Sequence, residues 1–218
     1  MWCLAGASLP RLFLDTTTEG MRQLMDQNYW SCADMAHATL SQWLAPSAEK
    51  KERHLIFTSS AVAFITIAGY AAYGPSKAAI KNLSDTLAQE VLLYGDHVKV
   101  HTVFPGSILS PGFENENKLK PDITFLLEAS DPQYTPDHVA KTAIAGLEKG
   151  EYLVTVGWLG TLMRACAWGG SARNNWIVDT ATIWLTSIVW GFVGYDLNSK
   201  VRAYGKKHGH PSTYVKKA

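Results

Sequence analysis

Short apolar runs alternate with amphipathic segments along most of this chain, and this alternation limits its fold more than any other feature. The apolar runs are residues 55–58, 98–104 and 152–156. Residues 20–44 and 78–93 space their apolar side chains as a helix does. A third helix is predicted over residues 136–149, because Thr135, Pro136 and Asp137 provide an N-cap, a first-turn proline and an early acid. Strands that alternate with helices are typical of an α/β fold with a mostly parallel sheet.

Composition narrows the function classes. With 218 residues the chain has the length of one domain, and 47% hydrophobic residues suffice for a packed core, which excludes a disordered protein. The formal net charge is +1, so no overall basic field favours a nucleic acid partner. The three cysteines, Cys3, Cys32 and Cys166, are too few and too scattered for a disulfide framework or a zinc site. This usage indicates a reducing compartment and no metal centre.

The strongest chemical signal is the pair Tyr73 and Lys77, which are four residues apart at the start of a predicted helix. This spacing places both side chains on one face, and Pro75 is tolerated there only in a first helical turn. An ammonium group beside a phenol favours the phenolate, so we expect Lys77 to lower the pKa of Tyr73 and make it a usable general acid. Taken alone, the pattern is equally that of a surface pair on a helix.

Ser60 strengthens the catalytic interpretation, because it follows directly after the apolar run 55–58. Open α/β sheets bind their ligands at the carboxyl ends of their strands. A hydroxyl at that position can hydrogen-bond a substrate carbonyl and the oxyanion that develops from it. Ser59 is the neighbouring hydroxyl, and we rank it second, as part of a turn at the strand end.

At these residues the chain resembles the short-chain dehydrogenase/reductase family, whose catalytic spacing Ser60, Tyr73 and Lys77 reproduce. Asn28 matches the helix asparagine that holds a water in that family's proton relay. The resemblance implies a Rossmann-type, doubly wound parallel sheet, here partial because its N-terminal strands are missing. The catalytic residues it implies are Ser60, Tyr73, Lys77 and Asn28.

The cofactor implied by the resemblance is NADPH. The stretch Pro105-Gly106 resembles the family's motif after the next strand, where the backbone and Ser110 meet the nicotinamide carboxamide; without the family it is an ordinary turn. Near the N-terminus, Ala5 and Gly6 keep the end of the family's Asn-x-Ala-Gly strand, with Cys3 in place of the asparagine. The cofactor-binding residues implied in this way are Ala5, Gly6, Tyr73, Lys77, Pro105, Gly106, Ile108 and Ser110.

Within the family, residues 110–117, residues 135–140 and the apolar C-terminal region with its basic tail resemble a membrane-associated branch. That resemblance implies reduction of the C3 ketone of a long-chain sphingoid base, at the cytosolic face of the endoplasmic reticulum membrane. A homodimer, through the helix at 77–93, is also implied. The open alternatives are reduction of another lipid, such as a steroid, a retinoid or a fatty acyl chain, and a non-catalytic interaction module.

The C-terminal quarter has a different character, so we divide the chain into a catalytic portion (1–157) and membrane-associated helices with a basic tail (158–218). Residues 177–195 are almost wholly apolar and carry one charge, Asp179, which makes them a borderline membrane-spanning segment. The alternative is an apolar helix that caps the catalytic portion or forms a dimer interface. Residues 153–170 are a second apolar stretch, expected either to dip into the membrane or to pack on the enzyme.

One expected feature of the family is missing. No glycine-rich turn precedes residue 20, although such a turn seats the cofactor's pyrophosphate at a helix N-terminus. The residues that select NADP over NAD are also absent. We therefore expect the chain to be a fragment, a shortened isoform or a shortened gene model, and to bind NADPH poorly or not at all by itself.

Overall fold

The computed structural model describes residues 1–129 and 131–165, together with single positions farther along the chain (177, 188, 191, 192, 195, 199, 202, 203, 206, 207 and 209). Its main sheet has four parallel strands in the spatial order β1 (Trp2–Cys3), β2 (Arg53–Thr58), β3 (Val98–Phe104) and β6 (Leu153–Thr155). Arg53 pairs with Val98 and Thr58 with Val103, so β2 and β3 are in register over six positions. The predicted parallel α/β sheet is confirmed.

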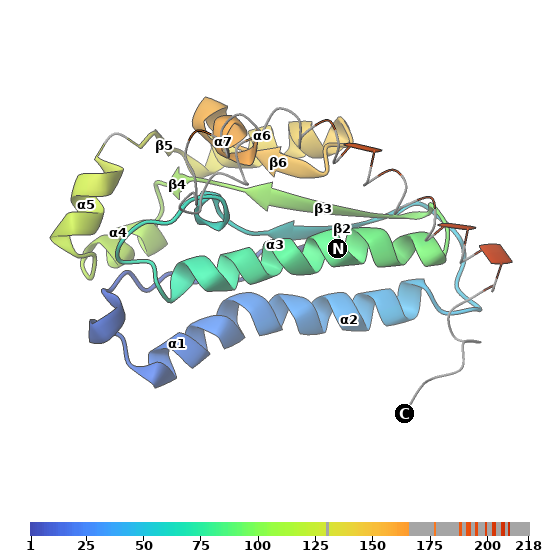
Figure 1. Cartoon of the computed structure of the whole chain (residues 1–218), viewed down its shortest axis with the longest axis horizontal. Coiled ribbons are helices and arrows are strands. Elements are labelled where there is room, and N and C mark those ends of the chain that lie inside the picture. The colour runs from blue at the N-terminus through green and yellow to red at the C-terminus, as the bar shows by residue number, and fades with distance from the viewer. Residues whose placement is uncertain are drawn as a thin grey trace.

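Helices cover both faces of this sheet (Figure 1). On one face lie α1 (Thr18–Met25), α2 (Ser31–Trp43) and α3 (Tyr73–Glu90), and on the other lie α6 (Pro136–Glu148) and α7 (Gly157–Ala165). A π turn, Asp26–Trp30, joins α1 to α2 into one long helix. Thr17 begins that helix as an N-cap, since its side chain accepts a hydrogen bond from the Gly20 backbone.

The connection after β3 holds more structure than the sequence predicted. It contains β4 (Ser107–Ile108), α4 (Pro111–Asn117), α5 (Asp122–Glu128) and β5 (Gln133–Tyr134), and β4 pairs with β5 in a second, two-stranded parallel sheet. Figure 1 shows these elements beyond the arrowheads of the main strands. Helices of seven residues complete only two turns, which is too short for a recognisable apolar period.

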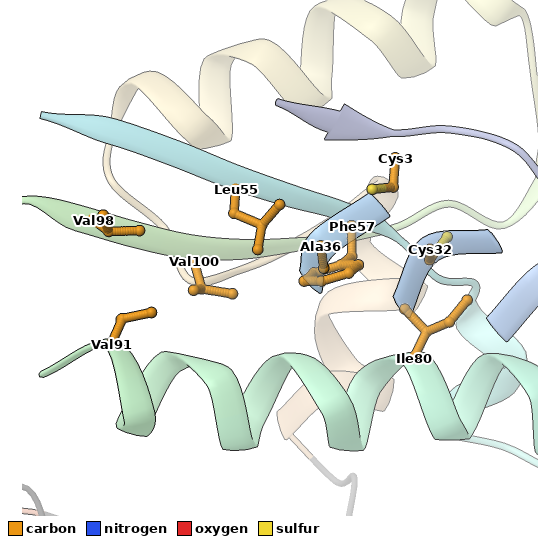
Figure 2. Packing of buried hydrophobic residues seen from close by; sticks show 9 residues of the cluster. All are labelled: Cys3, Cys32, Ala36, Leu55, Phe57, Ile80, Val91, Val98 and Val100. Atoms are coloured by element: carbon orange, nitrogen blue, oxygen red, sulfur yellow. The ribbon is translucent and has the colours of Figure 1, made fainter. Parts of the chain in front are cut away.

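The main core lies between the sheet and the helices α2 and α3 (Figure 2). Leu55 and Phe57 of β2 are fully buried there, and Ile80 meets them from α3. A smaller cluster on the opposite face joins β3 and β6 to α6 through Val103, Ala143 and Val154. Strands buried on both faces explain why the apolar runs of the sequence are continuous rather than alternating.

Two cysteines that the sequence left apart meet in this core. Cys3 of β1 and Cys32 of α2 are buried free thiols whose side chains share a hydrogen bond. That bond and burial raise the pKa of the Cys3 thiol above its usual value.

Of the two apolar C-terminal stretches, the structure describes most of the first and only single positions of the second. The first, 153–170, is described as far as residue 165 and forms β6 and α7, which pack together; Arg164 donates a hydrogen bond to the Leu153 carbonyl at 2.9 Å. Residues 153–165 therefore pack against the sheet. The second, 177–195, lies almost entirely outside the described residues. Within the described part of the chain, no helix has both the length and the apolar character that a membrane crossing requires.

Candidate active site

A pocket of about 490 Å³ opens at the carboxyl ends of the main strands. The predicted site residues that line it are Gly6, Ser60, Tyr73, Lys77, Pro105, Gly106, Ile108 and Ser110. Ala5 is exposed and Asn28 is buried behind the lining. Segments from five parts of the chain therefore converge where parallel strands end, as the position of Ser60 in the sequence predicted.

Tyr73 and Lys77 occupy the first turn of α3, with the Lys77 Nζ 5.8 Å from the centroid of the Tyr73 ring. The ammonium group donates a hydrogen bond to the Thr58 carbonyl at the end of β2, at 3.2 Å. Ser59 Oγ donates to the backbone carbonyl of Lys77 at 2.8 Å. The side-chain amine and the backbone carbonyl of Lys77 are thus both bonded to the end of β2. Ser59 therefore has a positioning role that the sequence did not indicate.

The pKa of Tyr73 differs from the expectation. Burial raises it to about 12, the negative charge of Glu116 adds to the increase, and a hydrogen bond with Ser60 opposes it. Burial also lowers the pKa of Lys77 to about 8, against a smaller opposing effect of Cys32. The expected lowering of the Tyr73 pKa is therefore not found, because loss of hydration outweighs the opposing hydrogen bond with Ser60.

Ser60 lies where β2 ends, and its side chain is largely buried. Its backbone is extended, and its Oγ caps a short 3-10 turn, Ala61–Ala63, by accepting a hydrogen bond from the Val62 backbone at 3.4 Å. The same hydroxyl hydrogen-bonds Tyr73. A phenol and a hydroxyl that share a hydrogen bond inside one pocket can both contact the oxygen of a bound carbonyl.

Asn28, predicted to hold a relay water, has its side chain bonded within the protein. It lies in the π turn and is fully buried. Its Nδ2 donates to the Ala7 carbonyl and to Ser76 Oγ, both at 2.9 Å, and its Oδ1 accepts from the Ala7 backbone at 2.7 Å. Both side-chain N–H groups are used within the protein, so the side chain fastens the segment after β1 to α3. The relay role stays a prediction.

Gly6 is required by this close packing. A Cβ atom there would lie 2.9 Å from Asn28 Oδ1 and 3.0 Å from Lys77 Nζ, nearer than side chains normally approach. Gly106, in contrast, has nothing within 4 Å of the same position. Gly6 thus lets Asn28 and Lys77 approach the backbone, whereas Gly106 leaves open space in the pocket lining, which fits a flat ring such as nicotinamide.

Ser110 caps a helix as well as lining the pocket. It is the N-cap of α4, and its Oγ accepts a hydrogen bond from the Phe113 backbone at 3.2 Å. The turn before it is held against Ser60, because the Ala61 backbone donates to the Pro105 carbonyl at 2.9 Å.

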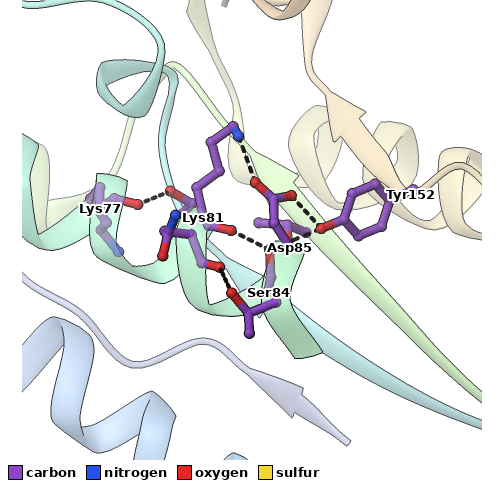
Figure 3. A network of polar contacts seen from close by, with 9 residues as sticks. Lys77, Lys81, Ser84, Asp85 and Tyr152 are labelled. Carbon is purple, nitrogen blue, oxygen red and sulfur yellow. Dashed lines mark hydrogen bonds and ion pairs between the residues drawn. The ribbon is translucent and has the colours of Figure 1, made fainter. Parts of the chain in front are cut away.

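A polar network behind the pocket fixes α3 against the sheet (Figure 3). Tyr152, just before β6, donates to Asp85, which also forms an ion pair with Lys81 at 2.8 Å. Ser84, fully buried, accepts a hydrogen bond from Thr102 of β3 at 2.7 Å. These contacts hold the helix that carries Tyr73 and Lys77 in a constant position.

A second polar cluster in the pocket wall was not assigned from the sequence. Tyr70 donates to Glu116 Oε1 at 2.6 Å, and Lys120 Nζ lies 3.5 Å from the same oxygen and 2.7 Å from Glu128 Oε2. The ring of Tyr70 lies 5.6 Å from that of Tyr73, measured between centroids. Glu116 belongs to a stretch that supported the resemblance, but only the structure places its carboxylate on Tyr70, whose ring lies near that of Tyr73.

Comparison with known proteins decides the family. Residues 3–120, more than half of the chain, match the family described as short chain dehydrogenase. The chain belongs to the short-chain dehydrogenase family. Two relatives in it are named 3-ketodihydrosphingosine reductase: that of Aspergillus fumigatus, 47% identical over 99% of this chain, and that of Neurospora crassa, 47% identical over 100%. The chain spans 64% and 62% of the lengths of these relatives, which is less than two thirds.

Solved structures show the same fold. A short-chain dehydrogenase from Sphingobium yanoikuyae in complex with NADPH has a TM-score of 0.61 at 20% identity, covering 85% of this chain and 63% of its own. One from Burkholderia cenocepacia in complex with NADP has a TM-score of 0.60 at 20% identity, covering 76% of this chain and 62% of its own. At this identity the likeness bears on the fold alone.

Proposed function

We propose that this chain is the catalytic part of an NADPH-dependent reductase that converts the C3 ketone of 3-ketodihydrosphingosine to the alcohol. The observation that supports it most is that Ser60, Tyr73 and Lys77 line one pocket at the carboxyl edge of a parallel sheet. The 47% identity to two reductases of that name, over nearly the whole chain, supports the substrate.

The residues have separate tasks in this reaction. Because its pKa is raised to about 12, Tyr73 carries its proton at neutral pH and can transfer it to the substrate oxygen. Ser60 donates a hydrogen bond to that oxygen and orients it. Lys77, held by Thr58, places a positive charge beside the phenolate that remains after proton transfer.

The nicotinamide end of NADPH fits the open space at Gly106, in the pocket that Gly6 and Lys77 also line. A bound NADPH supplies the hydride. The pocket wall around the reacting groups is largely apolar, with Leu4, Ile65 and Leu159 among its members, and suits a long hydrocarbon chain.

We also propose that the protein works at a membrane, at the cytosolic face of the endoplasmic reticulum. Exposed apolar side chains lie on two segments near the pocket mouth, namely Leu12, Phe13 and Leu14, and Ile123, Leu126 and Leu127 of α5. Both segments are hydrogen-bonded to the loop that lines the pocket: Arg11 donates to the Gly69 carbonyl at 2.8 Å, and Thr124 to that of Ala68 at 2.7 Å. A lipid could pass from a bilayer into the pocket across such a surface.

Assembly into a homodimer is proposed on the side of the sheet that carries α2 and α3, where Trp30 and Met35 are about half exposed. Size-exclusion chromatography with light scattering tests it. A monomer at micromolar concentration would contradict it.

The decisive experiment for the reductase is turnover. The protein expressed from its own gene is incubated with NADPH and 3-ketodihydrosphingosine, and dihydrosphingosine is measured by mass spectrometry alongside the loss of NADPH. Steroid ketones, retinal and fatty acyl ketones serve as competing substrates, and the Aspergillus relative is the positive control. Reduction of one of these lipids without reduction of the sphingoid ketone would contradict the assignment.

A further inference from the structure

The pocket wall carries an excess of negative charge close to the catalytic tyrosine. Glu116, Glu128 and Asp131 line the pocket, whereas Lys77 is the only cationic side chain among the described residues that do so. Lys120, which neutralises part of this charge, lies behind the lining: its side chain is only 1% exposed, and its amine is packed over the rings of Phe113 and Phe125. A ligand in the pocket therefore meets carboxylates rather than this lysine.

Glu116 is held rigidly at this position. The Tyr70 hydroxyl and the Lys120 amine both contact its Oε1, so within the described part of the chain Oε2 has no hydrogen bond or ion pair. Tyr70 is itself fixed, because its ring packs against Tyr73 and its backbone pairs with Arg11. A fixed carboxylate with one oxygen available is a pre-organised acceptor, and it binds a charged donor at little entropic cost.

The carboxylate also acts on the reacting group. It accepts a hydrogen bond from Tyr70, whose ring centroid lies 5.6 Å from that of Tyr73, and all three residues line the same pocket. Its negative charge also contributes to the raised pKa of Tyr73. A cation bound next to Glu116 would therefore lie beside a carbonyl bound to Tyr73 and Ser60. Ketones that carry an ammonium group on the adjacent carbon have this arrangement of charges.

From these relationships we infer that Glu116 is a specificity-determining residue that binds the ammonium group of a 2-amino ketone. The inference rests on the proposed reductase function, and it explains how the pocket distinguishes a sphingoid base from a neutral ketone with the same hydrocarbon chain. Tyr70 and Lys120 act as positioning residues for the carboxylate. Glu128 and Asp131 add negative potential at the same wall.

The test compares two substrates in one enzyme. A short-chain, water-soluble 2-amino-3-ketone and the same 3-ketone without the amine are reduced with NADPH, and the ratio of their kcat/KM values is measured. We expect the ratio to favour the amine in the unmodified protein and to fall about tenfold or more in Glu116→Gln, mainly through KM. Glu114→Gln on the exposed side of α4 is the matched control and should keep the ratio.

One further variant and one further measurement separate recognition from a general loss of structure. Glu116→Asp keeps the charge and should retain part of the preference, whereas Glu116→Gln should also shift the alkaline limit of kcat to lower pH, because it removes a charge that raises the pKa of Tyr73. A merely structural residue would lower both kcat/KM values together and leave the pH profile in place. Equal loss for both substrates would overturn the inference.

Failure of the proposed function can be told apart from failure of this inference. If the protein reduces both ketones equally well, the reductase stands and Glu116 is not the determinant. If it reduces neither, binding remains measurable: equilibrium dialysis of a short-chain 2-amino alcohol against its N-acetyl form should show a preference for the free amine that Glu116→Gln removes. Equal binding of the two forms would reject the ammonium site.

Discussion

The amine of Lys77 lies 5.8 Å from the ring centroid of Tyr73 and is bonded to the carbonyl of Thr58, so the lysine is fixed by a strand end before any ligand enters. This arrangement pre-organises the charge that a phenolate needs after it has given up its proton. It also means that the lysine can be studied separately from the tyrosine, because each has its own set of contacts.

Replacement of Tyr73 by phenylalanine removes the proposed proton donor and little else. We expect Tyr73→Phe to lower kcat by about 10²–10⁴-fold, the usual contribution of general acid catalysis. The measurement is steady-state turnover of the sphingoid ketone. Tyr29→Phe, which removes a phenol that does not line the pocket, is the control and should retain turnover; retained turnover in Tyr73→Phe would exclude the acid role.

The buried charge of Lys77 should lower the free energy of unfolding at neutral pH, although the proposed reaction needs that charge. Its pKa is lowered to about 8 from an ordinary 10.5, so the folded state disfavours the charged amine. This penalty is fully present below pH 8 and is lost as the pH rises toward 10.5, which corresponds to at most about 3 kcal/mol. Lys77→Met should therefore unfold at a higher temperature than the unmodified protein at neutral pH while losing activity.

The unfolding temperatures of Lys77→Met and of the unmodified protein should also be compared at alkaline pH. As the pH rises past 8, the unmodified protein should gain stability and Lys77→Met should not, so their unfolding temperatures should converge. Lys81→Met, on the same helix but paired with Asp85, lacks this burial and serves as the control. Parallel pH profiles of Lys77→Met and the unmodified protein would contradict the prediction.

Gly6 tolerates no side chain, by the geometry of its neighbours. Gly6→Ala would bring a methyl group against Asn28 and Lys77, and displacing them should cost about 1–3 kcal/mol of unfolding free energy. Gly106→Ala, where the added atom meets nothing within 4 Å, is the matched control for stability. Urea unfolding followed by circular dichroism distinguishes the two; an equal effect of both substitutions would refute the argument from close packing.

Acid should destabilise the sheet through His101. Burial lowers the pKa of this imidazole, helped by the charges of His54 and Lys99 and opposed by a hydrogen bond to the Glu151 backbone. The folded state then binds fewer protons than the unfolded state near pH 6.5, so stability is complete above that value and falls as the pH decreases through it. Unfolding temperatures measured across this range should decline less in His101→Gln than in the unmodified protein, with exposed His37→Gln as the control.

Membrane attachment through the pocket mouth can be tested by vesicle flotation. Leu14 and Leu126 are 93% and 71% exposed on the two segments beside the mouth. The double substitution Leu14→Asp and Leu126→Asp should reduce binding to phosphatidylcholine vesicles, because two charges would have to leave water. Ile144→Asp, at an exposed apolar position on α6, is the control and should bind as before; undiminished binding of the double variant would place the contact elsewhere.

The sequence predicted the elements whose signals are local. The β-branched run at Val98–Phe104 became β3 with those bounds, and Thr135 capped α6 as its residue type indicates. Ser60, Tyr73 and Lys77, chosen by their spacing along the chain, line one pocket because the strand–turn–helix connection brings them together. Two-turn helices such as α4 and α5 lack a sufficient period, so they were missed.

Properties that depend on the environment were not predictable in the same way. The pKa values of Tyr73 and Lys77 depend mainly on how deeply both side chains are buried. The spacing of two residues along the chain carries no information on their burial. Glu116 reaches the pocket because α4 and the loop before α3 meet in space, although Tyr70 and Glu116 are distant in sequence.

The π turn at Asp26–Trp30 keeps the buried side chains of the long helix on one face. Leu24, Asn28, Cys32 and Ala36 are all buried, at steps of four residues. In a regular α-helix each such step rotates about 40° too far, so a line of four would wind away from the sheet. The π turn has more residues per turn than an α-helix, so it reverses part of that rotation. One helix thereby presents apolar side chains to the core at both ends, and the Asn28 amide to Ala7 and Ser76 in the middle. Deletion of a single residue within the turn would rotate one of these sets of side chains toward solvent.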